Sequence, residues 1–373
     1  MKRNLLMGDQ TLFRDPDIFE IDHVPEQFNF RDTQLSELAY TMRPAMKGSR
    51  PFNSVIRGLP GTGKTTSVRV LFSEIEQTTK RVLPVYINCK YDRTRVSIFG
   101  SIFNRIFGHY PPTTGIAFRK VYNEIGNYLS ESRTVAVVCL DDVNYLMYEN
   151  RLNDILYVLL RLYEEFPGAR LGVIAAVSNM EIDLMTKVDS AVWSVFRPVD
   201  IYFPAYGYEE VREILLQRVH RGLYPGVISD EVLDLIVQRT VEAGDLRVGL
   251  TIIKESVANA EKAARKEVLA EDVSTSVSAK DIRLRDAIGG LSPEEKKFLA
   301  VLAEEVRDSE ELPTSGALYE IVNKRLSMGY ANFHKRLNKL ESMEIISLKT
   351  LQGRGQTREI SLRYEVEEVL KVL

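Results

Sequence analysis

Cysteine is scarce in this sequence of 373 residues: only Cys89 and Cys139 occur. Each lies inside an apolar run, which predicts two buried free thiols and excludes a disulfide framework or a cysteine-based metal site. Apolar runs of membrane-spanning length are absent, and the first residues lack the apolar stretch of a secretory signal. We therefore expect a soluble, cytoplasmic protein that makes no contact with membranes.

An excess of charge of either sign is absent too. The chain has 49 basic and 52 acidic residues and a formal net charge of -3. Any contact with nucleic acid must then come from a local basic surface and not from the bulk charge. A content of 45% hydrophobic and 27% charged residues is typical of globular proteins, and the length predicts two or three domains.

What the sequence does contain is a phosphate-loop pattern, G-x-x-x-x-G-K-[ST], at Gly58–Thr66. A strand-like run (53–57) precedes it and a helical pattern (66–77) follows it. Lys64 is expected to reach the β- and γ-phosphates of a nucleotide, and the Thr65 hydroxyl to ligate Mg²⁺. The alternative is a glycine-rich turn with a lone lysine, but the full pattern and its flanks favour nucleotide binding. The loop residues expected at the nucleotide are Pro60, Gly61, Thr62, Gly63, Lys64, Thr65 and Thr66.

Polar residues follow two further apolar runs. Asp141 and Asp142 end the run 134–140, and Asn179 ends the run 170–179. Because these runs alternate with helical patterns, we expect a parallel α/β sheet whose carboxyl ends meet at one edge. Asp141 would then hold Mg²⁺ through its water shell, Asp142 would polarise the attacking water, and Asn179 would position that water or touch the γ-phosphate. A solvated strand end and a turn residue are the plainer alternatives.

Two other segments are candidates for contact with the nucleotide. Val24 and Pro25, upstream of the phosphate loop, are expected either to contact the adenine or only to pack. From residue 204 the pattern becomes purely helical, with Ser229 and Asp245 as expected helix N-caps. Arg247 would reach the γ-phosphate from this helical segment; the alternative is a surface arginine paired with Asp245.

The last part of the chain has a different pattern. Three expected helices (294–305, 316–326 and 330–343) precede two short strands (345–348 and 358–362), which is the order of a winged helix-turn-helix. Gly289–Gly290 is the expected hinge. We therefore predict three domains: a nucleotide-binding core (1–203), a helical lid (204–288) and a winged-helix domain (289–373).

Basic residues are concentrated in this last domain. Between Lys324 and Arg363 there are nine basic and three acidic residues, so the segment carries 9 − 3 = +6. Such a concentration is typical of a surface that binds double-stranded DNA. A solvated charged helix, or a winged helix that binds protein, are the alternatives. Asn332 and Arg336 are expected at base edges, Lys335 and Lys339 at phosphates, and Arg354, Gln356 and Arg358 on the wing.

The ordered blocks resemble the AAA+ ATPases, and more narrowly the archaeal replication initiators of the origin recognition complex and cell-division-cycle family. The blocks are Gly58–Thr66, 140–142, 178–179, 203–206 and 244–247, followed by the winged helix. Residues 24–32 and 86–89 also resemble the family's early blocks. The resemblance implies an AAA+ fold, ATP or ADP with Mg²⁺ as cofactors, and Lys64 with Thr65 as the Walker A residues. It also implies Asp141 and Asp142 as Walker B, Asn179 and Arg247 as sensors, Tyr206 at the nucleotide, and a DNA-contacting insertion within 93–118.

Two departures from the family pattern bear on activity. Walker B ends in Asp142, where Glu is commoner, and residues 187–191 offer no clear arginine finger, with Arg197 a weak substitute. Both favour an ATP-state switch with slow hydrolysis. The resemblance implies a nucleoid-associated initiator that binds a replication origin, helps to load the replicative helicase and has other initiator subunits as possible partners. An ATP-dependent winged-helix transcription regulator and a clamp-loader-like remodelling ATPase are the alternatives.

Overall fold

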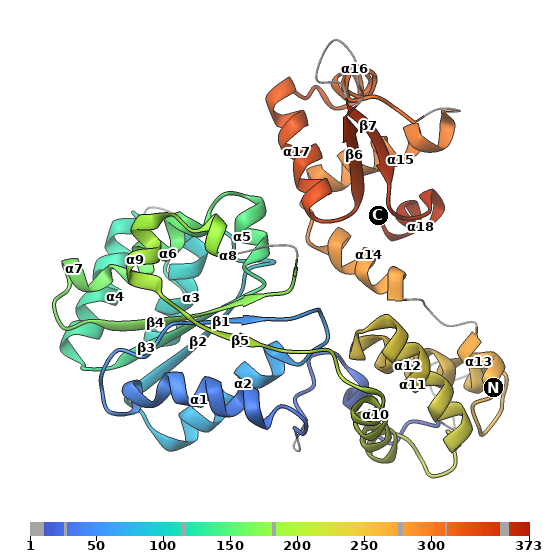
Figure 1. The fold of residues 1–373 in the computed structure, drawn as a ribbon, viewed down its shortest axis with the longest axis horizontal. Helices are drawn as coiled ribbons and strands as arrows, with labels where there is room; N and C mark the ends of the chain where they lie inside the picture. Colours follow the sequence, from blue (N-terminus) through green and yellow to red (C-terminus); the bar gives the residue numbers. More distant parts are fainter. Residues whose placement is uncertain are drawn as a thin grey trace, which may run out of the picture. The chain divides into compact units, whose positions relative to one another are not determined.

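The computed structural model describes residues 11–25, 28–112, 117–180, 184–274, 279–309, 312–350 and 358–373 (Figure 1). The chain divides into two compact units, Met1–Val277 and Ser278–Leu373. No helix among the described residues combines the length and the apolar character needed to cross a bilayer.

The first unit is built on a five-stranded sheet, and the strand order within the described residues is β2-β3-β4-β1-β5. Every neighbouring pair is parallel. β3 and β4 are buried almost throughout, which explains their continuous apolar sequences. The strands are β1 (Ser54–Arg57), β2 (Val82–Asn88), β3 (Val135–Asp141), β4 (Arg170–Val177) and β5 (Val199–Tyr202). β1, β3 and β4 coincide with the apolar runs 53–57, 134–140 and 170–179 of the sequence.

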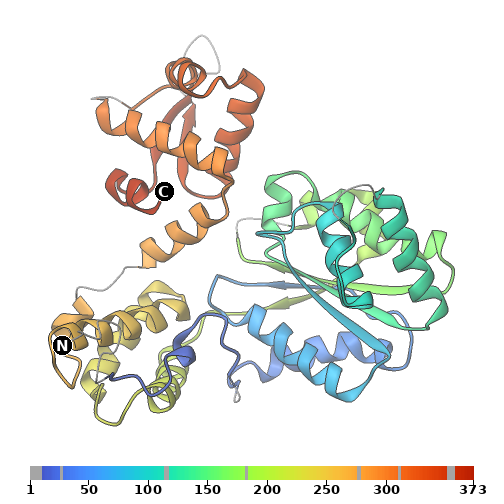
Figure 2. The ribbon, with the colours of Figure 1, turned by 180° about the vertical axis from the view of Figure 1, so that it is seen from behind.

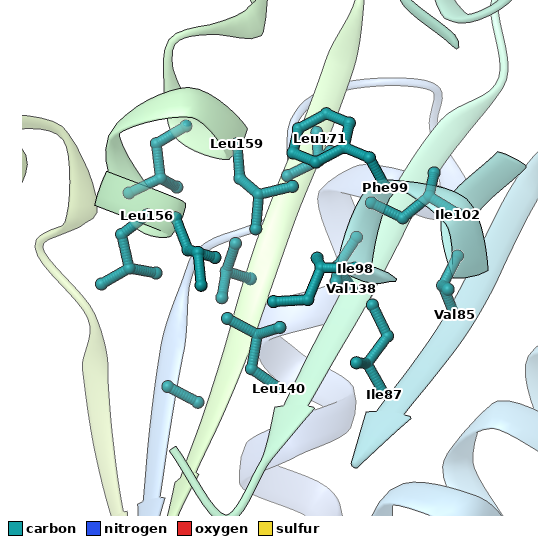
Figure 3. Close-up of a cluster of buried hydrophobic side chains, with 14 of the residues drawn as sticks. Val85, Ile87, Ile98, Phe99, Ile102, Val138, Leu140, Leu156, Leu159 and Leu171 are labelled. Carbon is teal, nitrogen blue, oxygen red and sulfur yellow. The ribbon is translucent and has the colours of Figure 1, made fainter. Parts of the chain in front are cut away.

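Helices cover both faces of this sheet (Figure 1). α1 (Asp32–Met46) and α2 (Lys64–Thr78) pack on one face with Ile56 of β1. On the other face, side chains of α3 and α6 lie over β2, β3 and β4, as Figure 3 shows for Ile98, Leu159 and Val138. The helices of this second layer and its connections are α3 (Arg95–Phe107), α4 (Phe118–Glu131), α5 (Asn144–Tyr148), α6 (Leu152–Leu160), α7 (Leu162–Glu165), α8 (Leu184–Lys187) and α9 (Ser190–Phe196).

A group of helices without strands completes the first unit. Ser229 accepts a hydrogen bond from the Val232 amide and Asp245 accepts one from the Arg247 amide, so both predicted N-caps are confirmed. The N-terminal segment packs on these helices (Figure 2), and Arg14 donates its amide hydrogen bond to the Gly222 carbonyl. The elements are η1 (Pro16–Phe19), α10 (Tyr208–Gly222), α11 (Asp230–Ala243), α12 (Leu246–Lys262) and α13 (Ala270–Ser274).

The second unit contains helices and one antiparallel strand pair, in the order expected of a winged helix. The N-terminus of α15 is closed by a capping box between Ser292 and Glu295. The unit begins before Gly289–Gly290, because α14 belongs to it and packs on α18. Its elements are α14 (Ala279–Gly289), α15 (Pro293–Asp308), α16 (Ser315–Leu326), α17 (Tyr330–Ser342), β6 (Ile346–Thr350), β7 (Arg358–Leu362) and α18 (Val366–Val372).

Candidate functional site

The phosphate-loop motif connects the end of β1 to the start of α2. Gly61 and Gly63 have φ angles of 73° and 91°, a region that favours glycine, and Gly63 is the N-cap residue of α2. Lys64 is 5% exposed, and its ammonium donates to the carbonyl oxygens of Gly58 (2.7 Å) and Leu59 (2.8 Å). Burial lowers the pKa of Lys64 to about 8, although Asp142 and Asp141 oppose the shift.

Asp141 lies at the carboxyl end of β3, beside the start of α2. The Thr65 hydroxyl donates to Asp141 Oδ2 at 2.6 Å, and the Tyr86 hydroxyl donates to the same oxygen at 2.7 Å. Tyr86 comes from β2, whose Asn88 is in register with Asp141. Thr65 and Asp141 therefore bring together a hydroxyl and a carboxylate, which are the hard oxygen ligands that Mg²⁺ prefers.

Asp142 has an uncommon backbone conformation, with a φ of 54°. Its amide donates to Asp141 Oδ1 at 3.0 Å, and its own carboxylate accepts a hydrogen bond from the Ser178 hydroxyl at 2.6 Å. Burial and the neighbouring Asp141 raise the pKa of Asp142, while Ser178 and Lys64 act against this shift. The structure therefore places a half-buried carboxyl beside the phosphate loop, and the Ser178 hydroxyl holds it by a hydrogen bond.

Asn179 follows β4, as the sequence predicted. Its amide nitrogen donates to the Tyr148 hydroxyl at 3.4 Å. It is Ser178, one residue earlier, that contacts Asp142.

The first turn of α12 meets the phosphate loop. A Cβ atom on Gly61 would collide with the Asp245 carboxylate, and Asp245 is only 3% exposed. The Arg247 guanidinium pairs with Asp245, with an N–O distance of 2.6 Å. This is the pairing given above as the alternative role of Arg247, but Asp245 is buried and not on the surface. The charge of Arg247 nevertheless acts on Lys64 and Asp142, since it helps to lower the pKa of Lys64.

The residues expected to contact the base of the nucleotide differ in exposure. Val24 is 40% exposed and Pro25 is half-buried. Tyr206 is buried, and its ring lies 3.6 Å below the Arg31 guanidinium. Within the phosphate loop, Thr62 is buried, whereas Pro60, Thr65 and Thr66 are half-buried.

In the second unit, α17 presents some of its polar side chains to solvent and uses others internally. Asn332 and Lys335 are exposed. Arg336 instead pairs with Glu294 at 2.7 Å and is 20% exposed. Lys339 departs from its expected contact with a phosphate: its side chain is 7% exposed and its ammonium pairs with Glu295 at 2.7 Å.

The predicted wing is described only at its base. Arg358 starts β7, is half-buried and donates to the Asn338 amide oxygen of α17 at 3.1 Å. This bond links the candidate recognition helix to the strand pair. Arg354 and Gln356 lie outside the described residues.

Comparison with known proteins gives concordant matches along the chain. Residues 50–182 match the AAA domain family, and residues 212–278 match the Cdc6 AAA+ ATPase-type lid domain. The chain is 41% identical to ORC1-type DNA replication protein 3 of Haloarcula marismortui, over 99% of this chain and 98% of that protein. It is 40% identical to ORC1-type DNA replication protein 2 of Methanosarcina mazei, over 99% and 98%. The chain belongs to the ORC1-type DNA replication protein family.

Solved structures agree on the fold of this ORC1-type protein. The Aeropyrum pernix ORC1 protein, solved in complex with DNA, matches with a TM-score of 0.77 and 24% identity, over 98% of this chain and 97% of that one. The Aeropyrum pernix ORC2 protein, solved as ADPNP–ADP complexes, matches with a TM-score of 0.64 and 21% identity, over 97% of each chain. The expected AAA+ fold and the membership of an AAA+ ATPase family of replication initiators are confirmed.

Sequence reasoning missed several residues of the site in this ORC1-type protein. Tyr86 and Ser178 donate hydrogen bonds to the two aspartates, and the Arg31 guanidinium lies over the Tyr206 ring. All three stand inside or next to blocks that carried the family resemblance, and this position was the only signal available. Their partners are far away in sequence, so spacing alone did not reveal the contacts.

Proposed function

We propose that this ORC1-type replication initiator is a nucleotide-controlled switch that binds origin DNA. ATP or ADP would bind at the phosphate loop with Mg²⁺ held by Thr65 and Asp141. The observation that carries this proposal is the hydrogen bond between these two residues, which links the loop to the acid pair across 76 positions of sequence. Mg²⁺ neutralises phosphate charge at such sites.

The other site residues would act on the phosphates, the water or the base. Lys64 would bind the β- and γ-phosphates, and Arg247 would reach the γ-phosphate from the lid, leaving Asp245. Asp142 would polarise the attacking water, with Asn179 orienting it. Val24, Pro25 and Tyr206 would enclose the base, with the loop residues Pro60, Gly61, Thr62, Gly63 and Thr66 around the phosphates.

Hydrolysis is proposed to be slow. A general base must be ionised to accept a proton, and burial with a like charge beside it disfavours the ionised form of Asp142. Its side chain is also one methylene shorter than that of Glu. Slow hydrolysis suits a protein in which bound ATP or ADP sets the conformational state and ATP turnover does not drive repeated remodelling.

The second unit supports duplex binding. Asn332 and Lys335 are exposed on α17, and Arg358 adjoins them through Asn338. We assign base contacts to Asn332 and phosphate contacts to Lys335 and Arg358, with the predicted Arg354 and Gln356 on the wing. Arg336 would bind DNA only by giving up Glu294. The Aeropyrum pernix relative was solved with DNA, which supports the same class of partner here.

In the cell, the protein would act at the nucleoid in the cytoplasm and help to load the replicative helicase, with other initiator subunits as further partners. Mapping where it binds its own genome tests this function. Enrichment at replication origins is expected. Enrichment at promoters would favour the transcription regulator instead, and rapid DNA-stimulated ATP turnover would favour a remodelling ATPase.

A further inference from the structure

One buried cation has no role in the chemistry proposed above. Arg31 precedes α1 and is 2% exposed. Its Nε donates to the Thr62 carbonyl of the phosphate loop at 2.9 Å. Its Nη2 donates to the Pro204 carbonyl, between β5 and α10, at 2.7 Å. One guanidinium thus joins the phosphate loop to the segment that connects the core to the lid, residues 203–207, which we call the linker.

Arg31 lacks the usual partner of a buried charge. Within the described chain it forms no ion pair, and its third hydrogen bond goes to the Phe30 carbonyl at 2.8 Å. Tyr206 stacks beneath it, and the charge of Glu210 acts on it only as a secondary influence. Burial lowers the pKa of Arg31. Because an enclosed cation without a carboxylate is costly, its neighbours must be arranged to hold it.

The backbone next to Arg31 also departs from ordinary geometry. Phe30 has a φ of 66°, which is uncommon for an aromatic residue. Residues held in such conformations persist only where the surrounding structure enforces them. Here the enforced conformation presents the Phe30 carbonyl to Nη1 of the guanidinium.

The phosphate loop itself is packed against the linker and the lid at each of its glycines. A Cβ atom on Gly58 would collide with the Phe203 carbonyl oxygen, and one on Gly61 would collide with Asp245. A Cβ atom on Gly63 would lie 2.6 Å from the Tyr206 hydroxyl. Glycine at these positions therefore permits close contact between the loop and the segments that carry the lid, in addition to any phosphate contact.

We propose that Arg31 is a positioning residue that transmits nucleotide binding from the phosphate loop to the linker. The inference rests on the proposed binding of nucleotide at this loop. Phosphates draw the loop amides around themselves, and the Thr62 carbonyl moves with its loop. Because the guanidinium is planar and rigid, a displacement at Thr62 is passed to Pro204. This route to the lid is separate from Arg247 and operates for ADP as well as ATP.

The test is hydrogen exchange on the full-length protein with and without Mg·ADP, comparing wild type with Arg31→Gln and Arg31→Lys. In the wild type, ADP should slow amide exchange both in the loop (58–66) and in the linker. In Arg31→Gln the loop should still respond, with affinity reduced about tenfold by the loss of charge-assisted hydrogen bonds. The linker should no longer respond to ADP.

Arg31→Lys distinguishes the effect of the two hydrogen bonds, to Thr62 and Pro204, from the effect of the positive charge. It also provides the test of the coupling role if Arg31→Gln does not fold. A lysine keeps the positive charge but lacks the rigid fork, so the linker should again fail to respond. The matched control is Arg218→Gln: Arg218 of α10 also donates to backbone carbonyls, to Ile18 at 2.7 Å and His23 at 3.5 Å. This control should behave as wild type.

Two contrary results have different meanings. If ADP slows exchange in the linker of both Arg31 variants as it does in the wild type, the coupling role of Arg31 is overturned while nucleotide binding stands. If ADP slows exchange nowhere in the wild-type loop, the proposed nucleotide site itself fails and the coupling role falls with it.

Discussion

At the scale of single residues, burial sets the charge of the groups around the phosphate loop. Lys64 has a lowered pKa and Asp142 a raised one, each because its charged form is removed from water. The two charges also stabilise each other, which moderates both shifts. A bound polyphosphate would add negative charge and favour the protonated form of Lys64.

The first prediction concerns pH and Lys64. Its pKa of about 8 in the folded protein lies below the ordinary 10.5, so folding releases a proton between these values. The contribution of Lys64 to the free energy of unfolding therefore rises with pH across this window. Phosphate needs the protonated form, so ADP affinity should fall above about pH 8, by at most about tenfold per pH unit.

Calorimetric titration of ADP from about pH 7 to about pH 9.5 measures this dependence, with Lys64→Arg as the control, because arginine stays protonated throughout. The variant should show little change in affinity over the range. An equally steep loss of affinity in Lys64→Arg would contradict the assignment to Lys64.

The second prediction concerns Asp142. Asp142→Asn removes the proposed base, so single-turnover ATP hydrolysis should slow about 10²- to 10⁴-fold. Nucleotide affinity should remain within a few-fold of the wild type. Because burial and Asp141 disfavour the ionised carboxyl, the variant should also be more stable at neutral pH. That difference should shrink as the pH falls and the wild-type carboxyl is protonated.

Parallel measurements of hydrolysis, ADP affinity and thermal unfolding separate these effects, and Asp142→Glu is the companion variant. Unchanged hydrolysis in Asp142→Asn would exclude Asp142 as the base.

The residues that the sequence predicted for the proposed nucleotide site are those with local signals. The phosphate loop is a contiguous motif, and Asp141 ends an obvious apolar strand. Tyr86 and Arg31 were not assigned roles because their contacts join distant positions: Tyr86 meets Asp141 across 55 residues and Arg31 meets Pro204 across 173. Hydrogen bonds of this kind depend on the sheet order, which the spacing of apolar residues does not determine.

At the scale of secondary-structure elements, α17 shows the same limit. The spacing of its apolar residues predicted the helix, and its composition showed that it is basic. Neither showed which basic side chains face outward. Phe333 and Leu337 are buried, so the face of α17 that carries them packs into the core. Glu295 lies 44 positions upstream, and its pairing with Lys339 draws that lysine inward. A tertiary contact therefore buries Lys339, while Lys335 on the same helix stays exposed.

The third prediction separates two lysines of α17. Lys335→Ala should weaken duplex binding at all sequences and reduce the slope of log affinity against log salt by about one. Lys339→Ala should leave that slope unchanged but destabilise the protein by about 1–3 kcal/mol, because Glu295 loses its partner in a largely buried pair.

Salt titrations of duplex binding and denaturant unfolding of the full chain measure the two effects. A reduced salt slope for Lys339→Ala, or an unchanged one for Lys335→Ala, would reverse the assignment.

At the scale of the whole molecule, the sequence predicted three domains and the structure forms two compact units. From residue 204 the sequence pattern changes from alternating strands and helices to helices alone, and this change predicted where the lid begins. It did not reveal that the lid contacts the phosphate loop through Asp245, or that the N-terminal segment hydrogen-bonds to α10. Gly289–Gly290 resembled a hinge, yet α14 before it packs on α18 in the second unit.

In the function proposed here, the bound nucleotide controls how this initiator holds DNA. The most direct measurement is a footprint on its own origin duplex with Mg·ATP and with Mg·ADP, for the wild type and Arg247→Ala. We expect a wild-type footprint whose extent differs between the two nucleotides, and an Arg247→Ala footprint whose extent is the same with both. Identical wild-type footprints with ATP and ADP would contradict this proposal.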